Sequence, residues 1–246
     1  MVNRVVIDCF PESVERYRKG YAVVAIDVIR ATTTAITAVC TGRKCFPVPT
    51  LESAFQLAGK LGNALLAGEV GGNVPEGFDL NNSPVQLLVR GDLCRPLVLL
   101  SSSGTKLIHA AGRCDMTYLA CFRNHAAVSS YLMSGMYRRV AVIGAGSRQE
   151  FREEDQMCCA WIAESLRQAG YQPEDPRTLA IIERWTGVPP AACADFKSAE
   201  YLKNSGQIED LRFILEKIND VNAVFTLEDN EVKRHTVITT QRALKR

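Results

Sequence analysis

Short apolar runs alternate along this chain with segments whose apolar residues recur at helical spacing, and this alternation is the strongest constraint on its fold. A chain that repeats strand and helix forms a largely parallel or mixed sheet with helices on both faces, so we predict a three-layer α/β/α fold. The predicted strands are 4–9, 22–27, 44–48, 64–68, 97–101, 116–121 and 139–143. The predicted helices are 11–19, 32–41, 51–61, 104–111, 124–135 and 150–169.

The pattern changes after about residue 175. Residues 198–218, SAEYLKNSGQIEDLRFILEKI, predict one or two helices. Residues 223–238, AVFTLEDNEVKRHTVI, predict a C-terminal β-hairpin that turns at Asp229 and Asn230. Because no Pro/Ser-rich linker interrupts the chain, we predict that residues 1–246 form a single α/β unit. A bilobed arrangement with a sub-lobe from about residue 175 is the alternative.

Composition excludes several function classes. A formal net charge of +2 over 246 residues is too small to indicate a nucleic-acid partner. No apolar stretch approaches the ~20 residues that span a bilayer, and the N-terminus lacks the apolar core of a signal peptide, so we expect no membrane partner and a cytoplasmic location. The nine cysteines include no C-x-x-C pair, and we expect most of them to be small buried hydrophobic residues in a reducing cytosol.

The first polar cluster, DVIRATTT, lies where the strand 22–27 passes into a helix. Helix N-termini present unpaired N–H groups that attract anions, and an arginine offers a bidentate donor, so we expect an anion site here. In the alternative, a threonine only caps the helix, and the acid and the arginine form a local ion pair. The residues concerned are Asp27, Arg30, Thr32, Thr33 and Thr34.

A second cluster follows the strand 97–101, where a glycine and several hydroxyl side chains precede a helix. Glycine lets backbone N–H groups converge and the hydroxyls are donors, so an oxyanion site is predicted. The alternative is a hydroxyl-rich turn that only caps the helix. These residues are Ser101, Ser102, Ser103, Gly104 and Thr105.

Residues 67–84, AGEVGGNVPEGFDLNNSP, predict a long irregular loop, which in a compact domain is usually functional or disordered. Its oxygen-bearing side chains suit a hard cation and its amides suit an anion. The residues we single out are Glu69, Asp79, Asn81, Asn82 and Ser83.

The stretch GAGSRQEFREED, residues 144–155, excludes a dinucleotide-binding loop, because Gln149 stands where the fingerprint needs its third glycine. The acids that follow suit a cation better than a pyrophosphate. We expect Glu150, Glu153 and Glu154 to be solvated in the first turn of the helix, whereas Asp155 is a candidate metal ligand.

Together, DVIRATTT, GEVGGNVPEGFDLNNSP, LLSSSGT, CFRN and GAG…EED resemble the 2-phosphosulfolactate phosphatase family over nearly the whole chain, most weakly after about residue 190. The resemblance implies a Mg²⁺-dependent phosphatase that converts 2-phospho-3-sulfolactate to 3-sulfolactate and phosphate, a step of coenzyme M biosynthesis. The implied partner is a small phosphorylated and sulfonated anion, and a homodimer is left open beside a monomer. Family membership does not fix which acid is dephosphorylated.

Under this resemblance the residues fall into three groups. Catalytic roles go to Asp27, Arg30 and Glu69, with Arg30 binding phosphate and stabilising charge in the transition state. Mg²⁺ ligands are Asp27, Glu69, Asp79 and Asp155, and Asp27 and Glu69 should face one cavity. Substrate-binding residues are Thr32–Thr34, Asn81–Ser83, Ser101–Thr105, Arg123 and Asn124.

Other phosphatase chemistries lack their residues. None of the cysteines precedes an arginine at C-x₅-R spacing, no histidine has a phosphatase context, and Ile29 replaces the second acid of an Asp-x-Asp-x-Thr motif. Asp27 can attack phosphorus covalently or hold a metal beside an attacking water; we favour the metal role because no neighbouring acid could protonate a leaving group. A lyase or phosphotransferase acting on another phosphorylated hydroxy acid, and a non-catalytic anion-binding protein, are the alternative functions.

Overall fold

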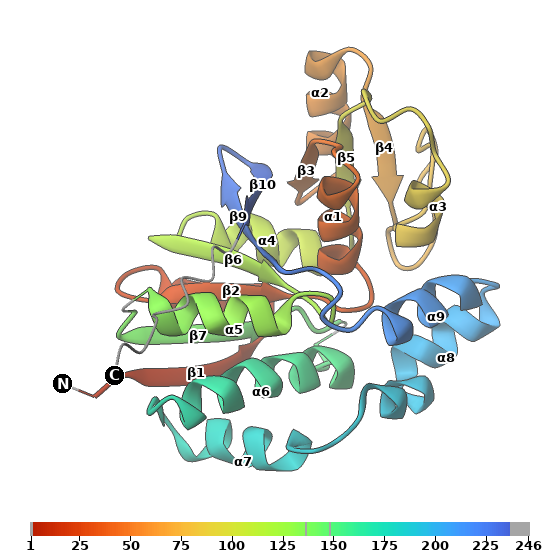
Figure 1. The fold of residues 1–246 in the computed structure, drawn as a ribbon. Coiled ribbons are helices and arrows are strands. Elements are labelled where there is room, and N and C mark those ends of the chain that lie inside the picture. Colours follow the sequence, from red (N-terminus) through yellow and green to blue (C-terminus); the bar gives the residue numbers. More distant parts are fainter. Residues whose placement is uncertain (1, 136, 148, 237–246) are drawn as a thin grey trace, which may run out of the picture.

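A computed structural model describes residues 2–135, 137–147 and 149–236, and Figure 1 shows its ribbon. Within these residues, seven strands form the larger sheet, in the order β10-β9-β6-β2-β7-β1-β8. The neighbouring strands β6, β2, β7, β1 and β8 run parallel to one another, and β9 and β10 add an antiparallel edge beside β6. Their bounds are β1 Arg4–Cys9, β2 Ala22–Ile26, β6 Met116–Ala120, β7 Arg139–Gly144, β8 Gln172–Pro173, β9 Ala223–Glu228 and β10 Glu231–Thr236.

Helices cover both faces of this sheet (Figure 1). Successive residues of a strand point to opposite faces, so Val24 packs against one helical layer and Val23 against the other. One layer consists of α5 His125–Ser134, α6 Glu153–Gln168 and α7 Pro176–Trp185; the other contains η1 Pro11–Tyr17, α1 Ala31–Cys40 and α4 Gly104–Ala111. The predicted three-layer α/β/α fold with a mixed, mostly parallel sheet is confirmed.

A second, smaller sheet stands beside α1 (Figure 1). Its three parallel strands lie in the order β3-β5-β4, with bounds β3 Cys45–Val48, β4 Leu65–Gly68 and β5 Leu97–Leu100. One face packs against α2 Leu51–Leu61, and the other joins the core that contains Ile36 of α1. The apolar pattern located these strands but carried no information on which strands pair, so it did not reveal the division into two sheets.

Several boundaries differ from the prediction. Residues 11–17 form a 3₁₀ helix that begins at Pro11. The helix expected from residue 150 begins at Glu153, because Ser147 and Glu150 exchange backbone hydrogen bonds in a turn. The pattern missed α7 and the short α3, Pro84–Leu88, which Ser83 caps.

The C-terminal part contains η2 Pro190–Asp195, α8 Lys197–Asn204 and α9 Ile208–Glu216. The last two share a small apolar cluster of Ala199, Leu202 and Leu211. The predicted hairpin forms from β9 and β10, with Asp229 and Asn230 at positive φ in its turn; its predicted last residues, 237 and 238, lie outside the described residues.

Two further predictions concern the cysteines and the bilayer. Six of the nine cysteines, all of which are described, are buried, as expected for small hydrophobic residues. Among the described residues, no helix combines the length and the apolar character that crossing a bilayer requires.

Candidate active site

A cavity of about 590 Å³ lies beyond the carboxyl ends of β2, β4, β5 and β7, where open parallel sheets bind ligands. Its acids are Asp27, Glu69, Glu150 and Asp155, and its cations are Arg30, Arg152 and Lys197. Hydroxyl groups come from Ser101, Ser102, Ser103, Ser147, Ser198 and Tyr201. The structure therefore brings Asp27 and Glu69 to one cavity, as predicted.

Backbone N–H groups bind two of these acids, Asp27 and Asp155, and one donor to Asp155 is Val28, the residue that follows Asp27. Asp155 Oδ1 accepts a hydrogen bond from the N–H of Val28 at 2.8 Å, and Oδ2 accepts one from Gly146 at 3.3 Å. Asp27 Oδ1 accepts the N–H of Ala31 at 3.1 Å, so Asp27 supplies the anion at the start of α1. Both side chains are buried, and the charge of Asp27 acts on Asp155.

Gly104 makes room for this arrangement. A Cβ at position 104 would lie 1.9 Å from Asp27 Oδ2 and 2.5 Å from the Cβ of Ala31. Gly104, predicted to bind substrate, instead gives Asp27 the space to approach α4, so any side chain there would displace the carboxylate.

The electrostatics follow from burial. The pKa of Asp27 is raised to about 7, chiefly by burial and also by the charges of Glu69 and Glu154, while the N–H of Ala31 and the charge of Arg30 act in the opposite direction. Burial, and then the charge of Asp27, raise the pKa of Asp155 well above its ordinary value. A cation placed between the two carboxylates would relieve this repulsion. Among the described residues no three His, Cys, Asp or Glu side chains are grouped to hold a metal, so this pair would need oxygens from water or a ligand.

Glu69 occupies the predicted serine-turn anion site with its own carboxylate. Its Oε1 accepts the N–H of Ser102 at 2.6 Å, and Oε2 accepts the Ser102 hydroxyl at 2.8 Å and the N–H of Gly72 at 2.7 Å. Ser101 and Thr105 cap α4 reciprocally, since Thr105 N–H donates to Ser101 Oγ and Ser101 N–H to Thr105 Oγ1. Ser101, Ser102 and Ser103 still line the cavity, whereas Thr105 is buried in the cap.

The threonine turn corrects a prediction. Thr32 donates its hydroxyl to the carbonyl of Asp27 at 2.7 Å, and Thr33 donates to the carbonyl of Val28 at 2.7 Å. Thr34 Oγ1 is buried without a hydrogen-bond partner among the described residues. Nearby carbonyls therefore accept the hydroxyls of Thr32 and Thr33, which fix the turn. None of the three threonines is among the described residues that line the cavity, so we no longer assign them to substrate binding.

Arg30 lines the cavity but does not pair with Asp27. Its Nη1 forms an ion pair with Asp210 at 2.5 Å, and its Nη2 donates to Asn81 Oδ1 at 3.2 Å. The alternative of a local Asp27–Arg30 ion pair is therefore also incorrect. Of the loop residues 81–83, only Asn82 is among the described residues that line the cavity, and its Oδ1 has no partner within them; Ser83 donates to Asp210.

Three more predicted residues lie elsewhere, because each is already bound within the protein. Asp79 accepts the N–H of Leu66 and pairs with Arg95 at 3.1 Å, so we remove it from the metal site. Arg123 pairs with Asp220 at 2.8 Å, and Asn124 is buried with its amide bonded to backbone groups. These contacts correct the assignment of Arg123 and Asn124 to substrate binding.

The three acids that precede Asp155 differ in their partners and in their burial. Glu150 pairs with Lys197 at 2.8 Å on the cavity rim, and Glu153 pairs with Arg184 at 3.0 Å. Glu154 is only 1% exposed, contrary to the predicted solvated position, and burial raises the pKa of its carboxyl. Sequence periodicity missed this burial because Ser198, which lies against Glu154, comes from the distant helix α8.

Sequence reasoning also missed the residues that α8 and α9 bring to the site. Lys197, Ser198 and Tyr201 line the cavity, and the Tyr201 hydroxyl donates to the carbonyl of Gly72 at 2.6 Å. Asp210 reaches Arg30 from α9. No motif in 190–216 marks these residues, and only the amphipathic helices that carry them could be predicted.

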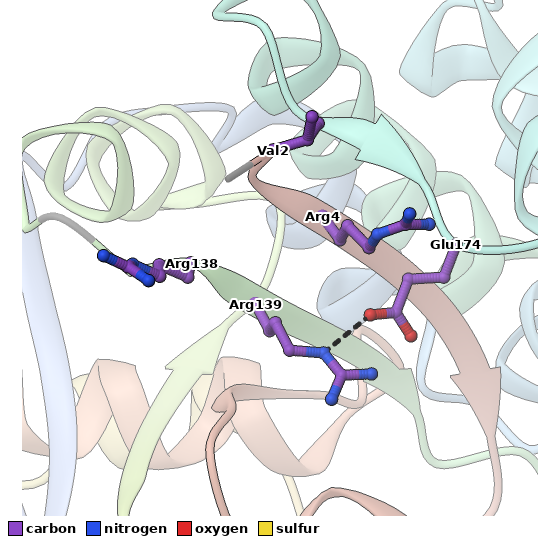
Figure 2. Close-up of a pocket in the computed structure, with 5 residues that line it drawn as sticks. All are labelled: Val2, Arg4, Arg138, Arg139 and Glu174. Carbon is purple, nitrogen blue, oxygen red and sulfur yellow. Dashed lines mark hydrogen bonds and ion pairs between the residues drawn. The ribbon is translucent and has the colours of Figure 1, made fainter.

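A second cavity, of about 550 Å³, lies at the opposite, amino ends of β1 and β7 (Figure 2). Arg139 is paired there with Glu174 at 2.9 Å, and Arg138 points away from that pair. Among the described residues that line this second cavity, Glu174 is the single acid. The first cavity contains both Asp27 and Asp155, and we therefore take the first cavity as the candidate active site.

The fold and the first cavity define the class: an α/β protein whose small-molecule site lies at the carboxyl ends of parallel strands. The family model described as 2-phosphosulpholactate phosphatase matches residues 9–230. The chain belongs to that family and is therefore a phosphoric monoester hydrolase.

Curated proteins that resemble this chain carry the name of the same family. The chain is 29% identical over 226 residues to a probable 2-phosphosulfolactate phosphatase of Clostridium perfringens, covering 87% of this chain and 89% of that protein. It is 35% identical to one of Thermus thermophilus, over 78% of this chain and 81% of that protein. A third, of Deinococcus radiodurans, is 32% identical over 82% and 81% of the two chains.

The buried acid pair makes stability depend on pH. Because the folded-state pKa of Asp27 lies above its ordinary value, ionisation of Asp27 should destabilise the metal-free protein as pH rises from about 4 to about 7, and this contribution should level off above pH 7. The Asn side chain of Asp27→Asn cannot ionise. The difference in the free energy of unfolding between this variant and wild type should therefore increase in favour of the variant across this window, by up to about 1.4 kcal/mol per pH unit.

Urea unfolding in EDTA at several pH values measures this difference, with Glu153→Gln, a surface ion-pair partner, as the control that should show no such trend. An Asp27→Asn protein less stable than wild type at pH 8 would mean that the carboxylate is not destabilised by its surroundings.

Proposed function

We propose that this chain is a Mg²⁺-dependent phosphatase that hydrolyses 2-phospho-3-sulfolactate to 3-sulfolactate and phosphate, the reaction type used in coenzyme M biosynthesis. The observation that carries the proposal is that two buried acids, Asp27 and Asp155, line the same cavity as Arg30 in a chain of this family.

The donor set fits a magnesium ion. Asp27 and Asp155 present hard carboxylate oxygens, and their mutual repulsion favours a divalent cation between them. When bound there, Mg²⁺ would offset negative charge on the transferring phosphoryl group. We assign Glu69 to a supporting role, because three donors from Ser102 and Gly72 bind its two oxygens, whereas each oxygen of Asp155 accepts a single backbone N–H. Through these hydrogen bonds, Glu69 fixes Ser102 and the serine turn 101–105 in their position beside the cavity.

Arg30 and the serine turn would receive the phosphate. Arg30 can donate hydrogen bonds toward the cavity while Asp210 and Asn81 hold its guanidinium from behind. Ser103 lies on the same cavity and its hydroxyl forms no cap bond to α4, which leaves it available to an oxyanion. These groups would stabilise the charge that develops on phosphate oxygens as water attacks phosphorus and the 3-sulfolactate oxygen leaves, taking up the proton that the water gives up, and Asp27 would help to hold the metal.

The sulfonate would bind at the rim, near Arg152 and Lys197. Both line the cavity, and in the structure both face Glu150, at 3.7 Å and 2.8 Å respectively. A second anionic group of the substrate can replace Glu150 as the partner of these cations. Such a rim would favour a substrate with two separated anions over a simple phosphate ester.

Phosphate release tests the proposed reaction. Purified protein should release phosphate and 3-sulfolactate in equal amounts from 2-phospho-3-sulfolactate when Mg²⁺ is present, and EDTA should abolish the release. Asp27→Asn should be inactive. Phosphate without 3-sulfolactate would indicate a lyase, transfer of the phosphoryl group to another acceptor would indicate a phosphotransferase, and activity that survives EDTA would contradict the metal assignment.

Substrate comparison tests the rim. Arg152→Ala and Lys197→Ala should raise KM for 2-phospho-3-sulfolactate by about tenfold, the loss expected for a charged hydrogen bond, and leave KM for 2-phospholactate unchanged. Lys203→Ala, on the same helix but outside the described cavity lining, is the matched control. Equal increases in KM for both substrates would show that the rim does not recognise the sulfonate.

A further inference from the structure

We propose that Asp210, on α9, is the positioning residue that holds Arg30 in its phosphate-binding orientation. The proposal rests on the role assigned to Arg30 above. It gives the C-terminal helices a part in catalysis that no polar motif of the sequence indicates.

The ion pair is buried from both sides. Arg30 is 4% exposed and Asp210 is 3% exposed, and Nη1 lies 2.5 Å from Asp210 Oδ2. The other oxygen of Asp210, Oδ1, accepts the hydroxyl of Ser83 at 2.7 Å and the N–H of Val85 at 3.1 Å. Every oxygen of this carboxylate is therefore bound, so the guanidinium has one well-defined partner position.

Asn81 supplies a second contact. Its Oδ1 accepts Arg30 Nη2 at 3.2 Å and the N–H of Asn82 at 2.6 Å, and its Nδ2 donates to Gln207 Oε1 at 3.0 Å. Gln207 is the residue that precedes α9, so both contacts of the guanidinium lead to the start of the same helix. Two contacts at different nitrogens fix the plane of a guanidinium, which a single ion pair cannot do.

The geometry separates this pair from an ordinary structural one. The Arg123–Asp220 pair, at 2.8 Å, is a comparable Arg–Asp contact, but neither residue is among the described residues that line the cavity. Arg30 does line it. Losing Asp210 should therefore leave the Arg30 charge near the substrate but let its plane rotate, which weakens transition-state binding more than substrate binding.

A double-mutant cycle tests this inference with phosphate release as the readout. Arg30→Ala should lower kcat/KM by about 100-fold or more, as loss of a charge-stabilising donor does. Asp210→Asn should lower kcat at least about tenfold with little change in KM. In the Arg30→Ala background, Asp210→Asn should have no further effect, because Asp210 acts through Arg30.

Asp220→Asn is the matched control and should leave both kinetic constants unchanged. Urea unfolding of each variant checks the fold. If Asp210→Asn does not fold, Asn81→Ala replaces it, since it removes the Nη2 contact and leaves the ion pair. The inference then predicts a lower kcat at unchanged KM, again only when Arg30 is present.

The outcomes distinguish the two proposals. If Asp210→Asn lowers kcat/KM by the same factor with and without Arg30, Asp210 only supports the fold and this inference is overturned alone. If Arg30→Ala has wild-type kinetics, the role of Arg30 fails and this inference fails with it. A large rise in KM with unchanged kcat would also contradict positioning.

Discussion

The carboxylates of Asp27, which follows β2, and Asp155, in the first turn of α6, are both buried and line one cavity, and backbone N–H groups are their hydrogen-bond donors. Burying two carboxylates in one cavity is unfavourable, because each loses its hydration and their negative charges repel. The surrounding structure accommodates the pair. Because Gly104 has no side chain, Asp27 has space beside α4, and the N–H of Gly146 donates to Asp155. A cation is the partner that would make this arrangement favourable.

Three parts of the fold meet at this cavity. Asp27 and Arg30 follow β2 of the larger sheet and Asp155 comes from α6, which packs on that sheet, while Glu69 follows β4 of the small sheet and accepts the N–H of Ser102 after β5. From the C-terminal helices, Tyr201 of α8 lines the cavity and donates to the carbonyl of Gly72, and Asp210 of α9 pairs with Arg30. The site therefore depends on how the small sheet and the C-terminal helices sit on the larger sheet.

Sequence patterns could predict the strand ends, because parallel strands present their carboxyl ends at one edge, and Asp27 and Glu69 at two of these ends do line the cavity, as does Asp155 in the helix after a third. They could not predict which hydroxyls and cations are already engaged. Thr32 bonds to a carbonyl five residues away, and Arg123 meets Asp220 across 97 residues. Asp210 was missed because its partner Arg30 lies 180 residues earlier, a separation over which periodicity carries no information.

The most direct test of the central claim is the position of a bound divalent ion. Anomalous diffraction from crystals grown with Mn²⁺, which takes oxygen ligands as Mg²⁺ does, locates the ion without reference to activity. The account predicts a peak between Asp27 and Asp155, with an oxygen of each at about 2.1–2.2 Å, and loss of that peak in Asp27→Asn. An ion bound elsewhere in the cavity, for example between Glu69 and Glu150, or no ion at saturating Mn²⁺, would contradict it.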